Sequence, residues 1–152
     1  MRPMIITRSI NAPIENVFET VADIRNFSKA LPHIVNVEFL TEQQSGLGTR
    51  FRETRLMNGK EAATELEVTE YQSNERIRLV ADSHGTVWNT LFTTSQTEDG
   101  PTELVMSMEA KPYKIVPKLM NPLISKLIRK AVESDMDGVK TYCEQSSSEP
   151  AT

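Results

Sequence analysis

Two oppositely charged side chains, Glu53 and Arg55, lie two residues apart in a segment that is expected to form a strand. Residues two apart on a β-strand point to the same face and lie roughly 6–7 Å apart along it, so long side chains can bridge them. Such a pair in an apolar cavity could orient a carbonyl, phenol or carboxylate of a ligand. An enzyme could use it too, with Arg55 polarising a carbonyl and Glu53 acting as acid or base.

The strand pattern allows two orientations of this pair. Phe51 and Met57 lie on the same face of the expected strand as Glu53 and Arg55. The opposite face carries Arg50, Arg52, Thr54 and Leu56. Because two arginines and a threonine lie on that second face, we expect it to contact solvent. Glu53 and Arg55, on the opposite face, would then point inward. A twist or bulge after Gly48 would instead bring both charges to solvent, and burying either charge alone would be costly.

The remaining reactive side chains form no familiar catalytic or metal-binding motif. Tyr113 or Tyr71 could supply a weak acid to the pair. His33 and His84 lie at turn positions without metal-ligand spacing, and we expect them at the surface, with a place at the cavity mouth as the alternative. The sequence contains neither a serine-centred glycine elbow nor a phosphate-binding glycine loop. It therefore favours neither a nucleophilic enzyme nor a metalloenzyme, and we expect no cofactor.

One long amphipathic helix is predicted from Pro122 to about Glu144. Its apolar residues recur with the helical period, at Leu123, Ile124, Leu127, Ile128, Ala131, Val132, Met136, Val139 and Cys143. At 1.5 Å per residue this helix is roughly 34 Å long, about the width of a small domain. It is therefore expected to cross a whole face of the molecule.

Between Pro32 and this helix the pattern has a period of roughly two, and the first residues of the chain are also β-prone. We expect strands at Met4–Ile10, Ile34–Thr41, Thr49–Met57, Lys60–Tyr71, Arg76–Asp82, Thr86–Thr97 and Thr102–Lys111. Tight turns between them, above all Asn58-Gly59, predict antiparallel pairing. Two short helices follow the first strand, and Asp23 caps the second. The expected fold class is α+β, a curved antiparallel sheet of about seven strands wrapped around the long C-terminal helix.

A sheet that wraps around a helix often encloses a cavity. Strand parity and apolar character select the expected ligand-binding residues, which are Phe51, Met57, Leu66, Trp88, Thr90, Phe92, Leu104, Met106, Met108, Met120 and Ile124. The methionines suit a cavity that accepts varied apolar shapes, although ordinary core packing would select the same residues.

Composition and charge narrow the partners and the compartment. The net charge of −4 argues against non-specific nucleic-acid binding. The only cysteine, Cys143, cannot form an internal disulfide and fits a cytoplasmic protein. No apolar run approaches the roughly 18 residues that span a bilayer, and Met1 to Ile10 lacks the pattern of a signal peptide. The basic segment from Lys111 to Lys130 is interpreted as a solvated face, or alternatively as a patch for a membrane surface or an anionic partner.

Several local sequences occur in the same order in a known superfamily. They are Ile10-Asn11-Ala12-Pro13, Val17-Phe18, Val21-Ala22-Asp23, Phe27, Leu31-Pro32, Gly46-Leu47-Gly48-Thr49-Arg50-Phe51, Val68-Thr69-Glu70-Tyr71, Arg76-Ile77 and Asp137 to Glu144 with Lys140. With the order of elements, they resemble the START-like or SRPBCC superfamily, which has the helix-grip fold. The likeness covers about residues 3 to 144 and is greatest for the polyketide cyclase/dehydrase branch. The Gly-Pro-Phe block of the coenzyme Q-binding branch is missing from His84 to Phe92.

The resemblance and the residue pattern together lead to three functional hypotheses. The first is a single domain over residues 1–144, with a disordered polar tail at 145–152, that binds a small hydrophobic molecule between the sheet and the C-terminal helix. The second is a cyclase or dehydratase acting on a carbonyl substrate without a metal. The third is a membrane- or protein-interaction module. The chain is expected to be a monomer or a homodimer, with no nucleic-acid partner.

Overall fold

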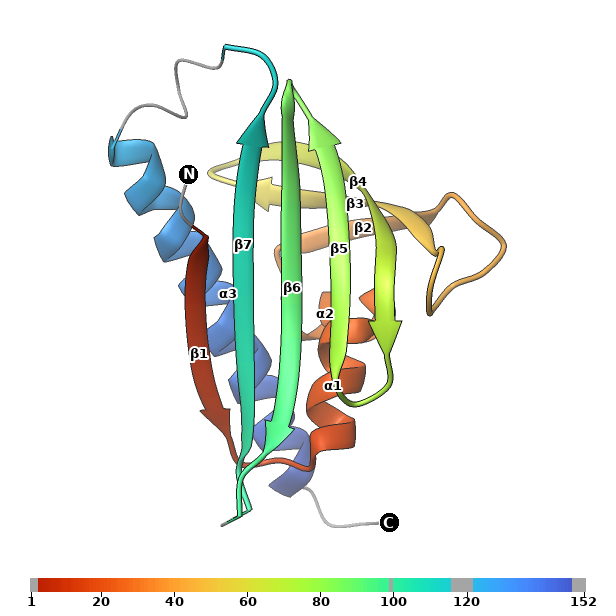
Figure 1. Cartoon of the computed structure of the whole chain (residues 1–152), viewed down its shortest axis with the longest axis vertical. Helices are drawn as coiled ribbons and strands as arrows, with labels where there is room; N and C mark the ends of the chain where they lie inside the picture. The colour runs from red at the N-terminus through yellow and green to blue at the C-terminus, as the bar shows by residue number, and fades with distance from the viewer. Residues whose placement is uncertain (1–2, 99, 116–121, 149–152) are drawn as a thin grey trace.

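The computed structural model describes residues 3–98, 100–115 and 122–148 of the chain. Its elements in chain order (Figure 1) are β1 (Met4–Ile10), α1 (Ile14–Ala22), α2 (Ile24–Ala30), β2 (Ile34–Phe39), β3 (Arg50–Met57), β4 (Lys60–Gln72), β5 (Arg76–Ser83), β6 (Thr86–Gln96), β7 (Thr102–Pro112) and α3 (Pro122–Ser148). Each predicted strand agrees with the observed one to within two residues at either end.

The seven strands form one antiparallel sheet in the order β1-β7-β6-β5-β4-β3-β2. Strands β2 to β7 follow one another as a meander, and β1 pairs with β7 at the far edge, where Ile6 lies opposite Met106. Figure 1 shows β2 to β4 turning across behind β5 and β6, so the sheet curls toward the helices. The predicted α+β helix-grip architecture is confirmed.

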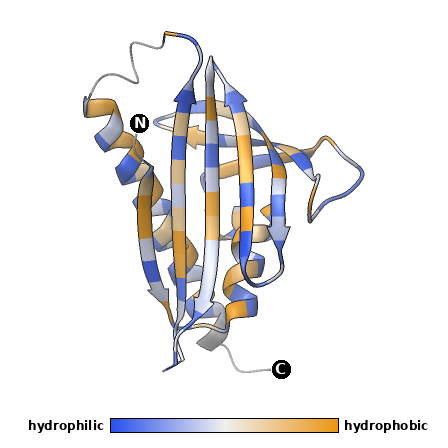
Figure 2. Ribbon diagram, viewed as in Figure 1, coloured by the Kyte–Doolittle hydropathy of each residue, from blue (hydrophilic) through white to orange (hydrophobic). Residues whose placement is uncertain are grey.

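The hydrophobic core lies between the inner face of the sheet, α1 and the C-terminal half of α3. Polar and apolar residues alternate along the strands (Figure 2), and the inward set includes Ile10, Ile77 and Leu104, which are fully buried. Phe18 of α1 packs on them and contacts the Tyr71 ring edge to face, with 5.5 Å between centroids. Burying a side chain of this kind contributes about 1.5–3 kcal/mol, so this packing holds helices and sheet together.

Helix α3 buries its apolar stripe only in its C-terminal half. Met136, Val139 and Cys143 are inaccessible to solvent, whereas Leu123 and Leu127 are 65% and 62% exposed. The predicted long helix is confirmed, but its apolar stripe is exposed in the first turns, which extend past the beginning of β1 (Figure 1). At its other end α3 continues to residue 148, so the first four residues of the predicted tail are helical, and 149–152 lie outside the described residues.

Polar contacts fasten the same C-terminal half of α3 to the N-terminal segments. The guanidinium Nε of Arg8 on β1 donates to Asp137 Oδ1 at 2.7 Å. The backbone N–H of Asn11 donates to Glu144 Oε2 at 2.9 Å. These contacts and the buried stripe fix the position of α3 along the sheet.

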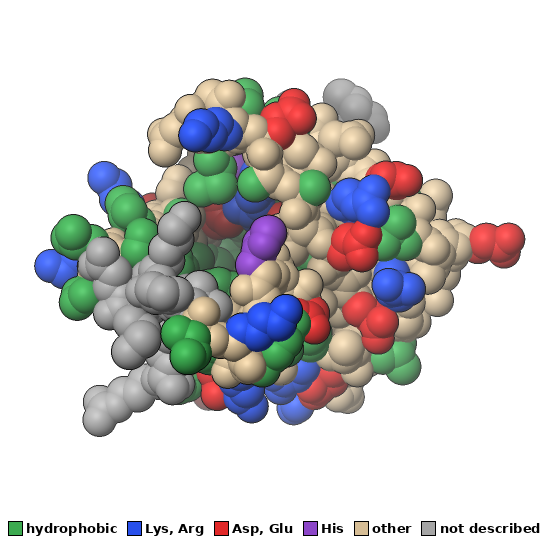
Figure 3. Space-filling model, turned by 90° about the horizontal axis from the view of Figure 1, so that it is seen from above, with side chains coloured by type: hydrophobic (Ala, Val, Ile, Leu, Met, Phe, Trp, Pro, Cys, Tyr) green, Lys and Arg blue, Asp and Glu red, His purple; other side chains and the backbone are tan. Residues whose placement is uncertain are grey.

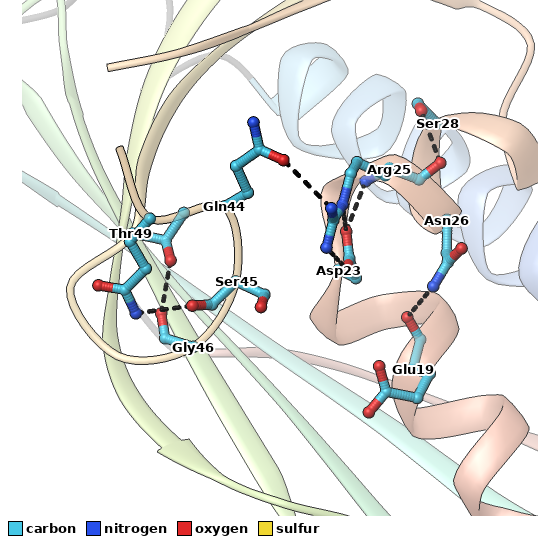
Figure 4. A network of polar contacts seen from close by, with 10 residues as sticks. Glu19, Asp23, Arg25, Asn26, Ser28, Gln44, Ser45, Gly46 and Thr49 are labelled. Atoms are coloured by element: carbon cyan, nitrogen blue, oxygen red, sulfur yellow. Dashed lines mark hydrogen bonds and ion pairs between the residues drawn. The ribbon is translucent and has the colours of Figure 1, made fainter. Parts of the chain in front are cut away.

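Asp23 holds the junction of the two short helices (Figure 4). As the N-cap of α2, its Oδ1 accepts from the Arg25 backbone N–H at 2.9 Å, and the Arg25 guanidinium donates to both carboxylate oxygens. Burial opposes ionisation, but the hydrogen bonds from Arg25 outweigh it and lower the pKa of Asp23 below its ordinary 3.8. Arg25 also reaches Gln44 in the β2–β3 loop, which ties this loop to the helix pair.

Candidate functional site

A cavity of about 120 Å³, here called the inner chamber, lies between the sheet, the short helix pair and α3. Its walls are Val21, Ala22, Ile24, Phe27, Phe51, Glu53, Arg55, Leu66, Leu79, Thr90, Phe92, Met106, Met108, Val132, Asp135, Met136 and Val139. All but Glu53, Arg55, Thr90 and Asp135 are apolar. The chamber therefore offers apolar surface with a few polar groups placed along it, as ligand cavities commonly do.

A wider outer chamber of about 430 Å³ adjoins the inner one along β4, β5 and β6. The two share five wall residues, here called the neck, which are Glu53, Arg55, Leu66, Thr90 and Met108. The outer chamber adds Trp88 and His84 among its walls. Seen from above, the molecule has a hollow with histidine, acidic and basic side chains around it and apolar side chains deeper inside (Figure 3).

The polar groups of the neck and α3 form one connected cluster. Alternation along β3 turns Phe51, Glu53 and Arg55 inward, as the sequence pattern favoured. The Nε of Arg55 donates to Glu53 Oε1 at 2.6 Å. Its Nη1 donates to Asp135 Oδ2 at 2.8 Å, which joins the sheet to α3 across 80 residues of sequence. The bulge considered after Gly48 does not occur within β3.

Burial and charge act in opposite directions on Arg55. Its side chain is 23% exposed, and those of Glu53 and Asp135 are 10% and 18% exposed. Burial alone would lower the pKa of Arg55, but the two carboxylates outweigh this and raise that pKa above its ordinary value. Arg55 is therefore a permanent cation whose charge is compensated by Glu53 and Asp135.

One nitrogen of Arg55 remains available to a ligand. Nε and Nη1 are engaged, whereas Nη2 has no hydrogen-bond partner among the described residues. No buried side-chain nitrogen or oxygen of the described residues lacks a partner, so Nη2 must be accessible rather than sealed in the core. It can donate to a carbonyl or hydroxyl oxygen placed in the neck.

His33 extends this cluster to the edge of the cavity. The backbone N–H of Leu56 donates to the His33 carbonyl at 2.8 Å, which places the imidazole beside Arg55. Its Nε2 lies 3.2 Å from Arg55 Nη1 and 3.3 Å from Asp135 Oδ1. A protonated Nε2 donates to Asp135, whereas an unprotonated Nε2 accepts from Arg55. His84 is exposed, as expected from the sequence, and lines the outer chamber, whereas the partly exposed His33 lines neither chamber and reaches the cavity only through Arg55 and Asp135.

Most of the residues predicted for the site lie on these walls. The inner chamber contains both candidate catalytic residues, Glu53 and Arg55. It also contains the predicted ligand-binding residues Phe51, Leu66, Thr90, Phe92, Met106 and Met108. Trp88 lies in the outer chamber. Whether any of them binds a ligand stays a prediction.

Three predicted lining residues lie on the correct face of their strand or helix, but at a position along it that is beyond the cavity. Leu104 is fully buried in the packed core, two residues along β7 from Met106. Met57 is 49% exposed near the end of β3, and Ile124 precedes the part of α3 that reaches the cavity, which begins at Val132. Met120 lies outside the described residues, as does Lys118 of the basic segment.

The sequence argument missed the contribution of α3 and of the short helices. Val132, Asp135, Met136 and Val139 follow one another at helical spacing and form one wall. The sequence offered one indication of this wall, which is a carboxylate, Asp135, directly before Met136 in the apolar stripe of the helix. The phase of the helix relative to β3, which brings Asp135 to Arg55, depends on tertiary packing.

The proposed weak acids do not reach the site. Tyr113 is 58% exposed, and its hydroxyl donates to Asp82 Oδ1 at 2.6 Å, outside both chambers. Tyr71 packs in the core against Phe18. Within residues 3–98, 100–115 and 122–148, no group of three or more acidic, histidine or cysteine side chains could hold a metal ion. None of the helices in these ranges is long and apolar enough to cross a bilayer.

Solved structures of other proteins share this fold. The protein TTHA0849 from Thermus thermophilus is 21% identical, with a TM-score of 0.77 over 96% of this chain and 99% of that one. A START superfamily protein from Mycobacterium smegmatis is 17% identical, with a TM-score of 0.77 over 95% and 99%. The major latex-like protein 151 from Panax ginseng is 9% identical, with a TM-score of 0.72 over 97% of each chain. At these identities the likeness concerns the fold.

The sequence itself identifies the family. No curated protein matches the chain. A family model described as "Polyketide cyclase / dehydrase and lipid transport" matches residues 5–144, nearly the whole described fold. The START-like, polyketide cyclase-like resemblance noted from the local sequences is thereby confirmed. The chain belongs to the polyketide cyclase / dehydrase and lipid transport family.

Proposed function

We propose that the protein binds one small, mainly apolar molecule in the two chambers, and that the cluster of Glu53, Arg55 and Asp135 holds a polar group of this molecule. The carrying observation is the accessible Nη2 of Arg55 beside an otherwise apolar chamber. Membership of the family supports hydrophobic-ligand binding in general terms. The residues 1–144 would form the binding domain.

The dimensions of the cavity support this proposal. The inner chamber, about 120 Å³, is close to an engineered apolar cavity of about 150 Å³ that stays dry and binds benzene. The outer chamber, about 430 Å³, lies within the roughly 300–1,000 Å³ range of ligand pockets. A molecule with one or two rings or a short chain could therefore place its apolar part inside and its polar atom at the neck.

A matched pair of tryptophan substitutions on β6 tests this proposal. Thr90 lies in the neck, and its neighbour Leu91 points to the other face of the sheet and lines neither chamber. A neutral fluorescent probe, N-phenyl-naphthylamine, should bind the natural protein saturably. Thr90→Trp should weaken this binding at least about tenfold, because the indole fills the neck, whereas Leu91→Trp should leave it unchanged.

Two controls complete this experiment. Circular dichroism should show that both variants keep the fold, so that a loss of binding reports on the neck. Native mass spectrometry of the purified protein should show an added mass that denaturation releases. Absence of saturable probe binding to the natural protein, or equal binding by the two variants, would reject a ligand site in these chambers.

A second candidate function is a metal-free reaction at a substrate carbonyl. The observation favouring it is the pairing of an accessible cationic N–H on Arg55 with the Glu53 carboxylate in the same neck. Arg55 would stabilise developing negative charge on the carbonyl oxygen, and Glu53 would accept a proton from the adjacent carbon. Arg55→Lys keeps the cation but loses the planar fork. If turnover of a polyketone substrate survives this change intact, the planar fork of Arg55 is not needed for the reaction.

A further inference from the structure

We infer that the cavity selects an electrically neutral ligand with a hydrogen-bond acceptor, such as a ketone or amide carbonyl, over a carboxylate of the same size. This inference rests on the proposed function and narrows its ligand class. It follows from the ionisable groups on the walls, from their contacts with one another, and from the small exposure of the two carboxylates.

The charges that face the ligand space do not balance. Among the described residues that line the two chambers, the ionised side chains are Glu53, Arg55 and Asp135. With the neighbouring His33 and the outer-chamber His84 uncharged, the walls carry one positive and two negative charges. The protein as a whole is also negatively charged, with a net charge of −4.

The single cation is already shared between two anions. Glu53 accepts from Nε at 2.6 Å and Asp135 accepts from Nη1 at 2.8 Å, so only Nη2 remains for the ligand. A ligand carboxylate at Nη2 would become the third anion around one guanidinium. Its attraction to Arg55 would be nearly cancelled by repulsion from the two protein carboxylates, which are 10% and 18% exposed and thus weakly screened.

Desolvation then decides between the two ligand types. An ionised carboxylate that enters an apolar chamber loses its hydration, and this cost must be offset by opposite charge in the wall. The walls provide no such surplus. A neutral carbonyl has a much smaller hydration to lose and still accepts the hydrogen bond from Nη2. The neutral ligand should therefore bind more tightly, at equal apolar area.

A ligand pair of equal shape isolates the effect of charge. Methyl naphthyl ketone and naphthoate share the ring system and the carbonyl position, and differ in a methyl group against a charged oxygen. Calorimetric titration at about pH 8, where histidine is neutral, measures both. The natural protein should bind the ketone at least about tenfold more tightly than naphthoate.

Asp135→Asn removes one repelling charge while keeping an oxygen that can accept from Arg55. It should tighten naphthoate binding at least about tenfold relative to ketone binding, because the wall becomes neutral. Asp137→Asn is the matched control on the same helix. Asp137 is 63% exposed, pairs with Arg8 and lines neither chamber, so its removal should change neither affinity. Glu53→Gln makes the same charge change from the sheet side, if Asp135→Asn folds poorly.

The outcomes separate this inference from the proposed function. Equal affinity for the two ligands, tighter binding of naphthoate, or no response to Asp135→Asn and Glu53→Gln would overturn the charge selection while binding itself stands. If neither ligand binds and the neutral fluorescent probe also fails, the proposed function falls, and charge selection with it.

Discussion

Replacing Arg55 by methionine should destabilise the fold as well as alter the cavity. Methionine keeps most of the apolar stem of the side chain, so packing is largely preserved. The change removes the guanidinium that contacts both Glu53 and Asp135. The two poorly hydrated carboxylates would then lose the guanidinium, and Asp135 would keep only its contact with the His33 imidazole at 3.3 Å. The link from β3 to α3 through Asp135 would also be lost.

The burial of the three side chains sets the expected magnitude. Removing one partner of a fully buried ion pair costs about 3–5 kcal/mol. Because Arg55 is 23% exposed and Asp135 18%, residual solvent reduces this to about 2–3 kcal/mol. For a chain of 152 residues, this corresponds to a Tm about 5–10 °C lower.

Arg52 on the same strand provides the matched control. It also contacts two carboxylates, Glu38 at 3.1 Å and Glu65 at 2.5 Å, but on the solvent face, where its side chain is 41% exposed. Exposed pairs of this kind contribute little to stability. Urea unfolding and thermal melts of Arg55→Met and Arg52→Met should show a large loss for the first and almost none for the second. Equal losses would refute the assignment of Arg55 to a buried, stability-bearing cluster.

Three further changes test the packing and the titrating groups. Gly138→Ala should lower the Tm despite the better helix propensity of alanine, since its Cβ would lie 2.7 Å from Cδ2 of the buried Leu31; a higher Tm in the melt would show that Leu31 can move aside. Because the pKa of Asp23 is lower in the folded state, its ionised form stabilises the fold above pH 3.8, and this contribution is lost as the pH falls through the folded pKa. Asp23→Asn should therefore cost stability at neutral pH and lose this deficit once the pH is below the folded pKa, which urea titrations at neutral and acid pH would measure; a deficit that persists in acid would exclude an ionic origin. Burial raises the pKa of the Cys143 thiol, so an aromatic disulfide reagent should label it at the rate of unfolding, and rapid labelling of the native protein would contradict its burial.

Most of the correct predictions about the site came from the alternation of side chains along the strands. Parity alone places Phe51, Glu53 and Arg55 on the inner face, and Asn58-Gly59 forms the predicted hairpin turn, with φ values of 53° and 77°. An odd or even position in a strand gives the face on which a side chain lies, but not whether that part of the strand borders the cavity. Leu104 and Met57 were misplaced for this reason.

The partners of Arg55 could not be predicted in the same way. Asp135 reaches it only because α3 docks in one rotational phase, and that phase is set by buried residues such as Val139 and by the close approach at Gly138. His33 reaches it through a backbone hydrogen bond between its carbonyl and the N–H of Leu56. Both contacts join segments far apart in the chain, where local periodicity carries no information.

The uneven attachment of α3 implies a gradient of local stability along one helix. Its contacts with Arg8, Asn11 and Arg55 all start at Asp135 or later, while the first turns expose Leu127. Amide hydrogens of the first turns should therefore exchange with solvent through local fraying, and those after residue 135 only through global unfolding. Fraying as far as Val132 would uncover the inner chamber. A small molecule could then enter and leave at the rate at which the first turns of α3 fray, while the rest of the fold stays intact.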